Sequence, residues 1–128
     1  MIIASIQMYS TGDKERNLQT MEKYLEHINK AFPNIKMVVF PELAAHGSIS
    51  NMRKEAEVIP GELTSIFSNM ANKYNLWLIP GSIYEKSDNE IFNTTPVFSS
   101  GGDLLGKYRK RYPWRPNEKT TPGGTHFT

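Results

Sequence analysis

The stretch MVVFPEL at residues 37–43 decides the fold, because it joins a short apolar run to an abrupt stop. Four apolar residues in succession, two of them β-branched valines, are typical of a buried strand. Pro41 ends this predicted strand, since proline has no N–H to give to a sheet. Glu42 follows at once. We therefore expect a carboxylate just beyond the carboxyl end of a buried strand, where open α/β sheets gather their ligands.

The residues before this stretch predict a strand followed by a helix. Residues 2–8, IIASIQM, form another short β-branched run, and residues 11–13, TGD, break it and offer capping side chains. Pro33 ends the helix. Its apolar residues recur at spacings of 3, 4 and 3, which places one face of the helix on a core: Leu18, Met21, Leu25 and Ile28.

The residues after the stretch repeat the alternation of helix and strand. Pro60-Gly61 marks a boundary, and residues 76–79, LWLI, predict a third strand that continues through Ile83. Between them lies a second amphipathic helix, whose apolar face consists of Leu63, Ile66, Phe67, Met70 and Tyr74.

The last third of the chain predicts a hairpin and an unfinished element. Residues 91–99 and 104–108 are two predicted strands, and residues 100–103, SGGD, supply the turn between them. The order β-α-β-α-β-β-β indicates an α/β fold. Residues 125–128, THFT, resemble the start of another strand with nothing after it. We therefore expect residues 1–128 to be the N-terminal part of a single domain, incomplete at its C-terminus.

The composition predicts a soluble, cytoplasmic protein. Apolar residues make up 38% of the chain, enough for a packed core, yet no run approaches the roughly 18 apolar residues that span a membrane. The N-terminal apolar run has no basic region before it, so it resembles a first strand more than a signal peptide. The absence of cysteine excludes disulfides and thiolate metal sites and fits a reducing cytosol. We predict no cofactor and no metal ion, since the histidines form no metal motif: His27, His46 and His126.

Residues 106–124, GKYRKRYPWRPNEKTTPGG, concentrate positive charge and leave three functions open. They could form a nucleic-acid-binding patch with stacking aromatic side chains, a solvated tail, or the wall of an active site. The whole chain carries a net charge of only +2, and Pro113, Pro116 and Glu118 interrupt the run. Both facts disfavour phosphate binding, so we predict no nucleic-acid partner. The basic residues are Lys107, Arg109, Lys110, Arg111, Arg115 and Lys119, and the aromatic ones are Tyr108, Tyr112 and Trp114.

Several segments, in the same order along the chain, resemble the nitrilase superfamily of carbon–nitrogen hydrolases. They are VVFPEL at 38–43, PGELTSIFSNMANKYNLWLIPGSIYE at 60–85, NTTPVFSSGGDLLGKYRK at 93–110 and the GKYRK to PGG stretch at 106–124. The resemblance implies an α-β-β-α sandwich, of which this chain holds about the first half. It also implies that Glu42 is a general base and that Lys110, 68 positions later, is the cation facing a tetrahedral intermediate.

Residues 113–124, PWRPNEKTTPGG, further resemble the aliphatic amidase and formamidase branch. This implies that Glu118 is a second glutamate that helps to hold the substrate, and that Trp114 lines the acyl pocket. Leu43 departs from the branch, whose members tend to have tyrosine after the first glutamate. The implied substrates are small non-peptide amides, or related nitrile or carbamoyl compounds. The implied complete protein uses no cofactor and is a homo-oligomer.

The catalytic triad of the superfamily also needs a cysteine, and this sequence has none. A thiol attacks as the thiolate, after a carboxylate has taken its proton. We therefore expect the cysteine beyond residue 128 and no activity in these residues alone. Ser48 and Ser50 lie near Glu42, but no His–Asp pattern or Gly-x-Ser-x-Gly elbow supports a serine nucleophile. The alternatives are a non-catalytic half-domain that associates with a partner chain, or a nucleic-acid-binding module.

Overall fold

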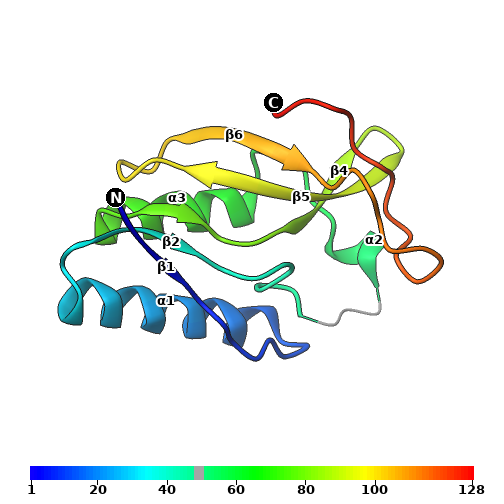
Figure 1. The fold of residues 1–128 in the computed structure, drawn as a ribbon. Coiled ribbons are helices and arrows are strands. Elements are labelled where there is room, and N and C mark those ends of the chain that lie inside the picture. Colours follow the sequence, from blue (N-terminus) through cyan, green and yellow to red (C-terminus); the bar gives the residue numbers. More distant parts are fainter. Residues whose placement is uncertain (48–50) are drawn as a thin grey trace.

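The computed structural model describes residues 1–47 and 51–128, which form one sheet with three helices (Figure 1). The predicted succession of strands and helices is confirmed, and a short helix that the sequence pattern did not indicate is added. Ser48 and Ser50 lie outside the described residues. The elements are β1 Ile2–Ser5, α1 Lys14–Ala31, β2 Ile35–Val39, α2 Met52–Glu55, α3 Glu62–Tyr74, β3 Trp77–Ile79, β4 Ile83–Ser87, β5 Glu90–Phe98 and β6 Leu104–Arg109.

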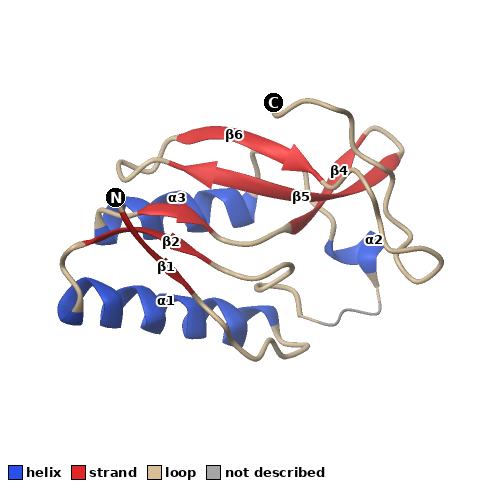
Figure 2. Cartoon of the chain, viewed as in Figure 1, coloured by secondary structure: helices blue, strands red, loops and turns tan. Residues whose placement is uncertain are grey.

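The strands form a mixed sheet in the order β1-β2-β3-β5-β4, with β6 on the other edge of β5 (Figure 2). Strands β1, β2 and β3 run parallel, whereas β5 runs antiparallel to β3, β4 and β6. It follows that β2 and β6 point in the same direction. Their carboxyl ends therefore lie at one end of the sheet, although Val39 and Arg109 are 70 positions apart in the chain.

The two long helices cover one face of this sheet and form the core with it. Helix α1 begins after Asp13, whose carboxylate accepts a hydrogen bond from the Arg16 N–H at 3.1 Å, and it ends just before Pro33, as predicted. None of the helices in the described ranges is long and apolar enough to cross a membrane. The buried core residues include Met21, Leu25 and Ile28 of α1, Leu63, Phe67 and Met70 of α3, and Val38, Leu78 and Phe98 of the sheet.

The predicted third strand is divided in two at residues 80–82. Strand β3 pairs with β5 through Leu78 and Phe98, and β4 continues along the same edge of β5 from Ile83, so the interruption is a bulge in one long path. Gly81 has a φ of +81°, and a Cβ at this position would lie 1.9 Å from the carbonyl oxygen of Pro41. The bulge therefore lets the turn after β2 approach the sheet edge, which no side chain at residue 81 would permit.

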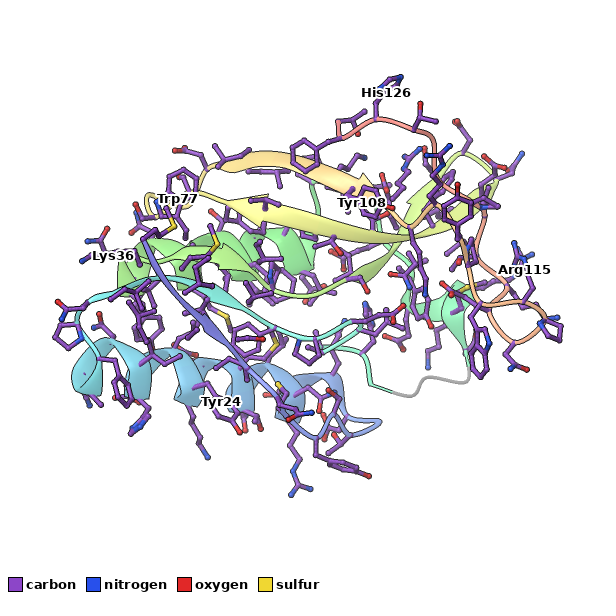
Figure 3. The ribbon with its side chains drawn as sticks, viewed as in Figure 1. Tyr24, Lys36, Trp77, Tyr108, Arg115 and His126 are labelled. Atoms are coloured by element: carbon purple, nitrogen blue, oxygen red, sulfur yellow. The ribbon has the colours of Figure 1, made fainter. Side chains whose placement is uncertain are left out.

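The face of the sheet opposite the helices is open in this chain. The register places Ile3, Met37 and Trp77 in one row on that face, and Tyr108 of β6 also points to it (Figure 3). Ile3 is 54% exposed and Tyr108 is 45% exposed. Thr128 pairs with Lys107 of β6: its N–H donates to the Lys107 carbonyl at 3.0 Å, and the N–H of Lys107 donates in return. The expectation that residues 125–128 begin another strand agrees with this pairing, although no strand has formed there.

Candidate functional site

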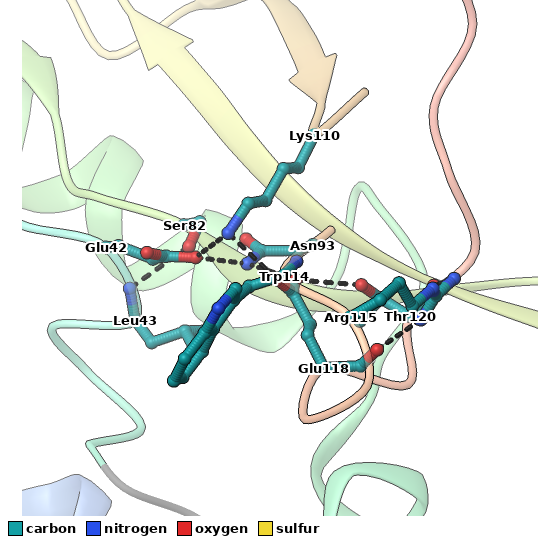
Figure 4. Close-up of polar contacts among 9 residues, drawn as sticks. All are labelled: Glu42, Leu43, Ser82, Asn93, Lys110, Trp114, Arg115, Glu118 and Thr120. Carbon is teal, nitrogen blue, oxygen red and sulfur yellow. Dashed lines mark hydrogen bonds and ion pairs between the residues drawn. The ribbon is translucent and has the colours of Figure 1, made fainter. Parts of the chain in front are cut away.

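Four polar side chains meet where β2 and β6 end (Figure 4). The ammonium Nζ of Lys110 lies 2.9 Å from Glu42 Oε1 and 2.8 Å from Glu118 Oε2. The side-chain amide of Asn93, in β5, donates to both acids, at 2.6 Å to Glu42 and 3.0 Å to Glu118. The structure thus brings together Glu42, Lys110 and Glu118, the three residues named from the sequence, and adds Asn93 to them.

Glu118 is a carboxylate with a donor on every side. Its Oε1 accepts hydrogen bonds from Asn93 and from the Thr120 hydroxyl at 2.8 Å, while its Oε2 binds Lys110 and the Trp114 N–H at 2.9 Å. Burial alone would raise the pKa of Glu118, but these donors, Lys110 first among them, hold it at about 2. Glu118 is therefore a fixed anion at neutral pH.

Lys110 is held by its backbone as well as by its side chain. Its N–H donates to the Asn93 carbonyl at 2.7 Å, one residue beyond the end of β6, and its own carbonyl accepts from the Gly123 N–H at 2.8 Å. The hydrogen bonds to Glu118 and then to Glu42 raise the pKa of Lys110 above its ordinary value. The side chain is therefore an ammonium, which can face negative charge that develops on a substrate.

Glu42 has one occupied oxygen and one open oxygen. Its Oε1 accepts from Asn93 and Lys110, whereas Oε2 receives no donor from any residue in the two described ranges. The side chain is 55% exposed. A carboxyl group with an open oxygen can exchange a proton with a neighbouring group.

The turn that carries Glu42 is fixed by the bulge between β3 and β4. Leu43 has a φ of 52°, which is uncommon for a residue with a branched side chain, and its N–H donates to the buried Ser82 hydroxyl at 3.0 Å. Ser82 follows Gly81, whose lack of a side chain admits Pro41. The strained turn and its support together determine the direction in which Glu42 leaves the sheet edge.

An open cleft of about 960 Å³ lies over this group of side chains. Trp114 lines it, and this residue is 70% exposed. A smaller hollow of about 300 Å³ reaches Glu42, Asn93 and Lys110 from the open face of the sheet. The site is thus accessible from two sides, and the larger cleft has the volume of a small-molecule site. Its other lining residues are Met8, Tyr9, Ser10, Pro41, Leu43, Gly47, Tyr84 and Asn117.

The alternation of side chains along β6 divides the basic run between the two faces of the sheet. Lys107 and Arg109 point to the face opposite Lys110 and both bind Glu85, with Arg109 Nη2 at 2.8 Å. Burial would raise the pKa of Glu85, but its bonds to Arg109, Lys107 and Thr94 bring it to about 2. Lys107 and Arg109 are therefore paired with Glu85 and are not free to bind a ligand.

The rest of the basic run is also largely committed to internal contacts. Arg115 donates to the carbonyl of Thr120 at 2.7 Å and to that of Glu118, which closes the loop on itself. In the part of the chain that the structure describes, only Arg111 and Lys119 of the run form neither an ion pair nor a hydrogen bond. Such a surface leaves few free cations for a phosphate backbone.

The three histidines lie far apart. His27 is exposed on α1, and Figure 3 shows His126 on the C-terminal segment pointing away from the sheet. His46 is fully buried, and neither ring nitrogen has a partner among the described residues. Burial lowers the pKa of His46 to about 4. Within residues 1–47 and 51–128 no three metal-ligating side chains come together.

Sequence reasoning missed Asn93 and Ser82 as parts of the site. Both lie inside segments that read as strands or strand connections, where a polar residue has no chemical signature of its own. The available signal was the position of Asn93 in a predicted strand beside the one that ends at Lys110. To place Asn93 beside Lys110 one must know the register between β5 and β6, and the sequence alone does not give it.

Comparisons with known proteins place this geometry in a family. A model of the carbon–nitrogen hydrolase family matches residues 2–127. The chain is 38% identical over 109 residues to the omega-amidase NIT3 of Saccharomyces cerevisiae, covering 79% of this chain and 37% of that protein. It is 27% identical over 119 residues to a formamidase of Bacillus cereus, covering 89% and 36%. The crystal structure of S. cerevisiae Nit3, described as a member of branch 10 of the nitrilase superfamily, superposes with a TM-score of 0.86 and 33% identity.

That superposition covers 95% of this chain and 48% of the Nit3 chain. The chain therefore spans less than half the length of the relatives it matches, and its α/β fold is about half of a nitrilase-type fold. It contains no cysteine. Because the family model matches residues 2–127 and the fold agrees, the chain belongs to the carbon–nitrogen hydrolase family.

Proposed function

We propose that this chain forms the first half of a carbon–nitrogen hydrolase domain that cleaves small non-peptide amides through a Glu-Lys-Cys triad. Glu42 and Lys110 belong to this chain, and the cysteine lies beyond residue 128. The observation that carries the proposal is the position of the Lys110 ammonium, held between Glu42 and Glu118 on the wall of an open cleft. A fixed cation beside a carboxylate with a free oxygen is the arrangement that acyl transfer to a thiol requires.

The proposed reaction begins with transfer of the thiol proton to Glu42. The thiolate attacks the amide carbon, and the oxygen of the carbonyl becomes an oxyanion that faces Lys110. Collapse of this intermediate breaks the carbon–nitrogen bond, and Glu42 returns the proton to the leaving amine. Water then attacks the thioester, with Glu42 again accepting a proton, and the acid is released with the thiol restored.

We propose that the cysteine approaches Glu42 and Lys110 through the smaller hollow. This hollow opens on the uncovered face of the sheet and is lined by Glu42 and Lys110, which also line the larger cleft. Thr128 pairs with Lys107 along β6, so we propose that the segment carrying the cysteine starts from this edge of the sheet. A segment that returned across the open face would bring a thiol to the two residues, while the larger cleft received the amide.

The substrate class rests on the relatives. The yeast protein is called an omega-amidase and the Bacillus cereus protein a formamidase, and both names describe hydrolysis of amides. We propose an amidase close to these two groups, in which Glu118 fixes Lys110 and borders the substrate and Trp114 lines the acyl side of the cleft. We also propose that the complete protein is a homo-oligomer.

Two measurements test the proposal. The intact mass of the protein from its native source should lie well above 14.6 kDa, and the complete protein should release ammonia from small amides. The variant Lys110→Ala should lower kcat/KM about a hundredfold or more, on the scale of a lost oxyanion donor. Lys119→Ala, an exposed lysine of the same loop, is the matched control and should retain activity. Retained activity in Lys110→Ala would contradict the proposed role.

One observation favours a second candidate, a half-domain that associates with a partner chain. The open face carries exposed apolar side chains such as Ile3 and Tyr108, and exposed apolar sheet surface promotes association. A native mass of 14.6 kDa per chain, together with a second polypeptide that co-purifies, would favour this candidate. A soluble monomer of that mass in sedimentation would count against it.

A further inference from the structure

Asn93 occupies an unusual place between the two acids. Its single nitrogen Nδ2 carries two hydrogens, and one lies toward Glu42 Oε1 while the other lies toward Glu118 Oε1. The reversed amide would turn its carbonyl oxygen against two carboxylates, so chemistry fixes the orientation. Only 3% of Asn93 is exposed. The amide itself is therefore shielded from solvent.

The backbone of Asn93 sets the position of the third member of the group. Its carbonyl accepts the Lys110 N–H at 2.7 Å, in line with the β5–β6 ladder. The same residue therefore fixes where Lys110 leaves the sheet and how far apart the two carboxylates lie. We propose that Asn93 is a positioning residue, whose amide ties Glu42 to Glu118 across Lys110 and keeps one oxygen of Glu42 open. The catalytic interpretation of this inference rests on the proposed function, whereas its test by titration does not.

Charge explains why an amide suits this position. Two carboxylates share one ammonium, so the group carries a net negative charge and the acids repel each other. A neutral group that donates to both offsets part of this repulsion without adding a cation that would neutralise Glu42 further. Aspartate has nearly the same shape but would add a third carboxylate, and alanine would leave both acceptors without this donor.

The two hydrogen bonds also divide the roles of the acids. Because Asn93 and Lys110 both bind Oε1 of Glu42, the pair is held through a single oxygen and Oε2 stays available. Glu118 receives four donors and has no such free oxygen. Asn93 gives one hydrogen bond to each acid, so the difference between them comes from Thr120 and Trp114, and the part of Asn93 is to hold Glu42 through Oε1 alone.

The first test uses the intact protein from its native source and needs no substitution. The two side-chain amide protons of Asn93 are followed by NMR while the pH is lowered, together with the carboxyl carbons of Glu42 and Glu118. One amide proton should shift with the midpoint of Glu42 and the other with the midpoint of Glu118, which lies near 2. Amide protons that follow neither carboxyl would overturn the proposal.

The second test compares variants at two asparagines of the same cleft. Asn93→Ala should raise the titration midpoint of Glu118 by about one pH unit, the loss of one hydrogen bond to a charged group. Asn117→Ala is the matched control, since Asn117 lines the cleft, is exposed, and forms no side-chain hydrogen bond with any described residue. An unchanged midpoint in a folded Asn93→Ala chain would refute the positioning role.

A third variant covers the case in which alanine destabilises the strand. Asn93→Asp keeps the shape of the side chain and should raise at least one carboxyl midpoint in the group above 4.5, whereas Asn117→Asp should not. If Asn93→Asp left every midpoint unchanged, the proposal would be wrong. These titrations need no cysteine and no substrate. A complete protein without amidase activity would therefore refute the proposed function, while the titrations alone decide the role of Asn93.

Discussion

The ammonium of Lys110 lies 2.9 Å from Glu42 Oε1, although 68 positions separate the two residues in the chain. The contact exists because β2 and β6 point in the same direction, so their carboxyl ends lie at the same end of the sheet. Neither residue reaches the other through a flexible loop. Lys110 continues the hydrogen-bonded ladder of β6. Glu42 lies in a turn that is held by the hydrogen bond between the Leu43 N–H and the Ser82 hydroxyl. The pair is thus a property of the strand ends.

The ion pair between Lys110 and Glu118 predicts a change in titration when the cation is removed. The folded pKa of Glu118 lies at about 2, below the ordinary value of 4.5, so its stabilising contribution is complete above pH 4.5 and is lost as the pH falls toward 2. In Lys110→Ala the carboxyl keeps its burial but loses its cation, and its midpoint should rise by at least one pH unit. NMR titration of the Glu118 carboxyl carbon measures this shift. Lys119→Ala should leave the midpoint in place.

The buried His46 predicts a loss of stability in mild acid. Its folded pKa of about 4 lies below the ordinary 6.5, so the unfolded chain binds the proton more tightly, and stability falls as the pH drops from 6.5 to 4. The difference corresponds to about 3 kcal/mol. Urea unfolding of the His46→Leu variant should show a smaller pH dependence in this window. His27→Leu, on the exposed side of α1, should keep the full dependence, and an equal slope in all three chains would contradict the prediction.

The ion pairs of Glu85 predict that a substitution remote from the cleft strongly lowers the free energy of unfolding. Its carboxylate is 2% exposed and compensates two cations, Lys107 and Arg109. Glu85→Gln preserves the shape but leaves both cations without their counter-ion, which should cost roughly 3 kcal/mol in the free energy of unfolding. The exposed pair of Glu26 and Lys30 supplies the control, and Glu26→Gln should cause no measurable change in urea unfolding.

The close contact between Gly81 and Pro41 predicts that a side chain at residue 81 destabilises the turn that carries Glu42. Gly81→Ala adds a methyl group at a positive φ and directs it at the Pro41 carbonyl, so a loss of roughly 3 kcal/mol in unfolding free energy is expected. Gly12→Ala is the control, because open space surrounds that position. Comparable midpoints of urea denaturation for the two variants would show that the turn can move aside without cost.

Much of the fold follows from local patterns in the sequence. The spacing of Met21, Leu25 and Ile28 predicted α1, and its face is buried as expected, because 3.6-residue periodicity needs no knowledge of the partner surface. Short apolar runs followed by Pro41 and Pro80 predicted β2 and β3 in the same way. Residues at strand ends were also identifiable, and the resemblance to a family named Glu42, Lys110 and Glu118, which the structure brings together.

The remaining features depend on pairing between distant strands. The sequence by itself determined the elements other than α2 and the division of β3 from β4, and it pointed to three members of the site. Only the tertiary structure decided that Asn93 bridges two acids, that Glu85 takes Lys107 and Arg109, and that the strand path bulges at Gly81. The physical reason is register. A shift of one residue between β5 and β6 would move every side chain to the opposite face, and the sequence records periodicity along a strand but not its alignment with a neighbour.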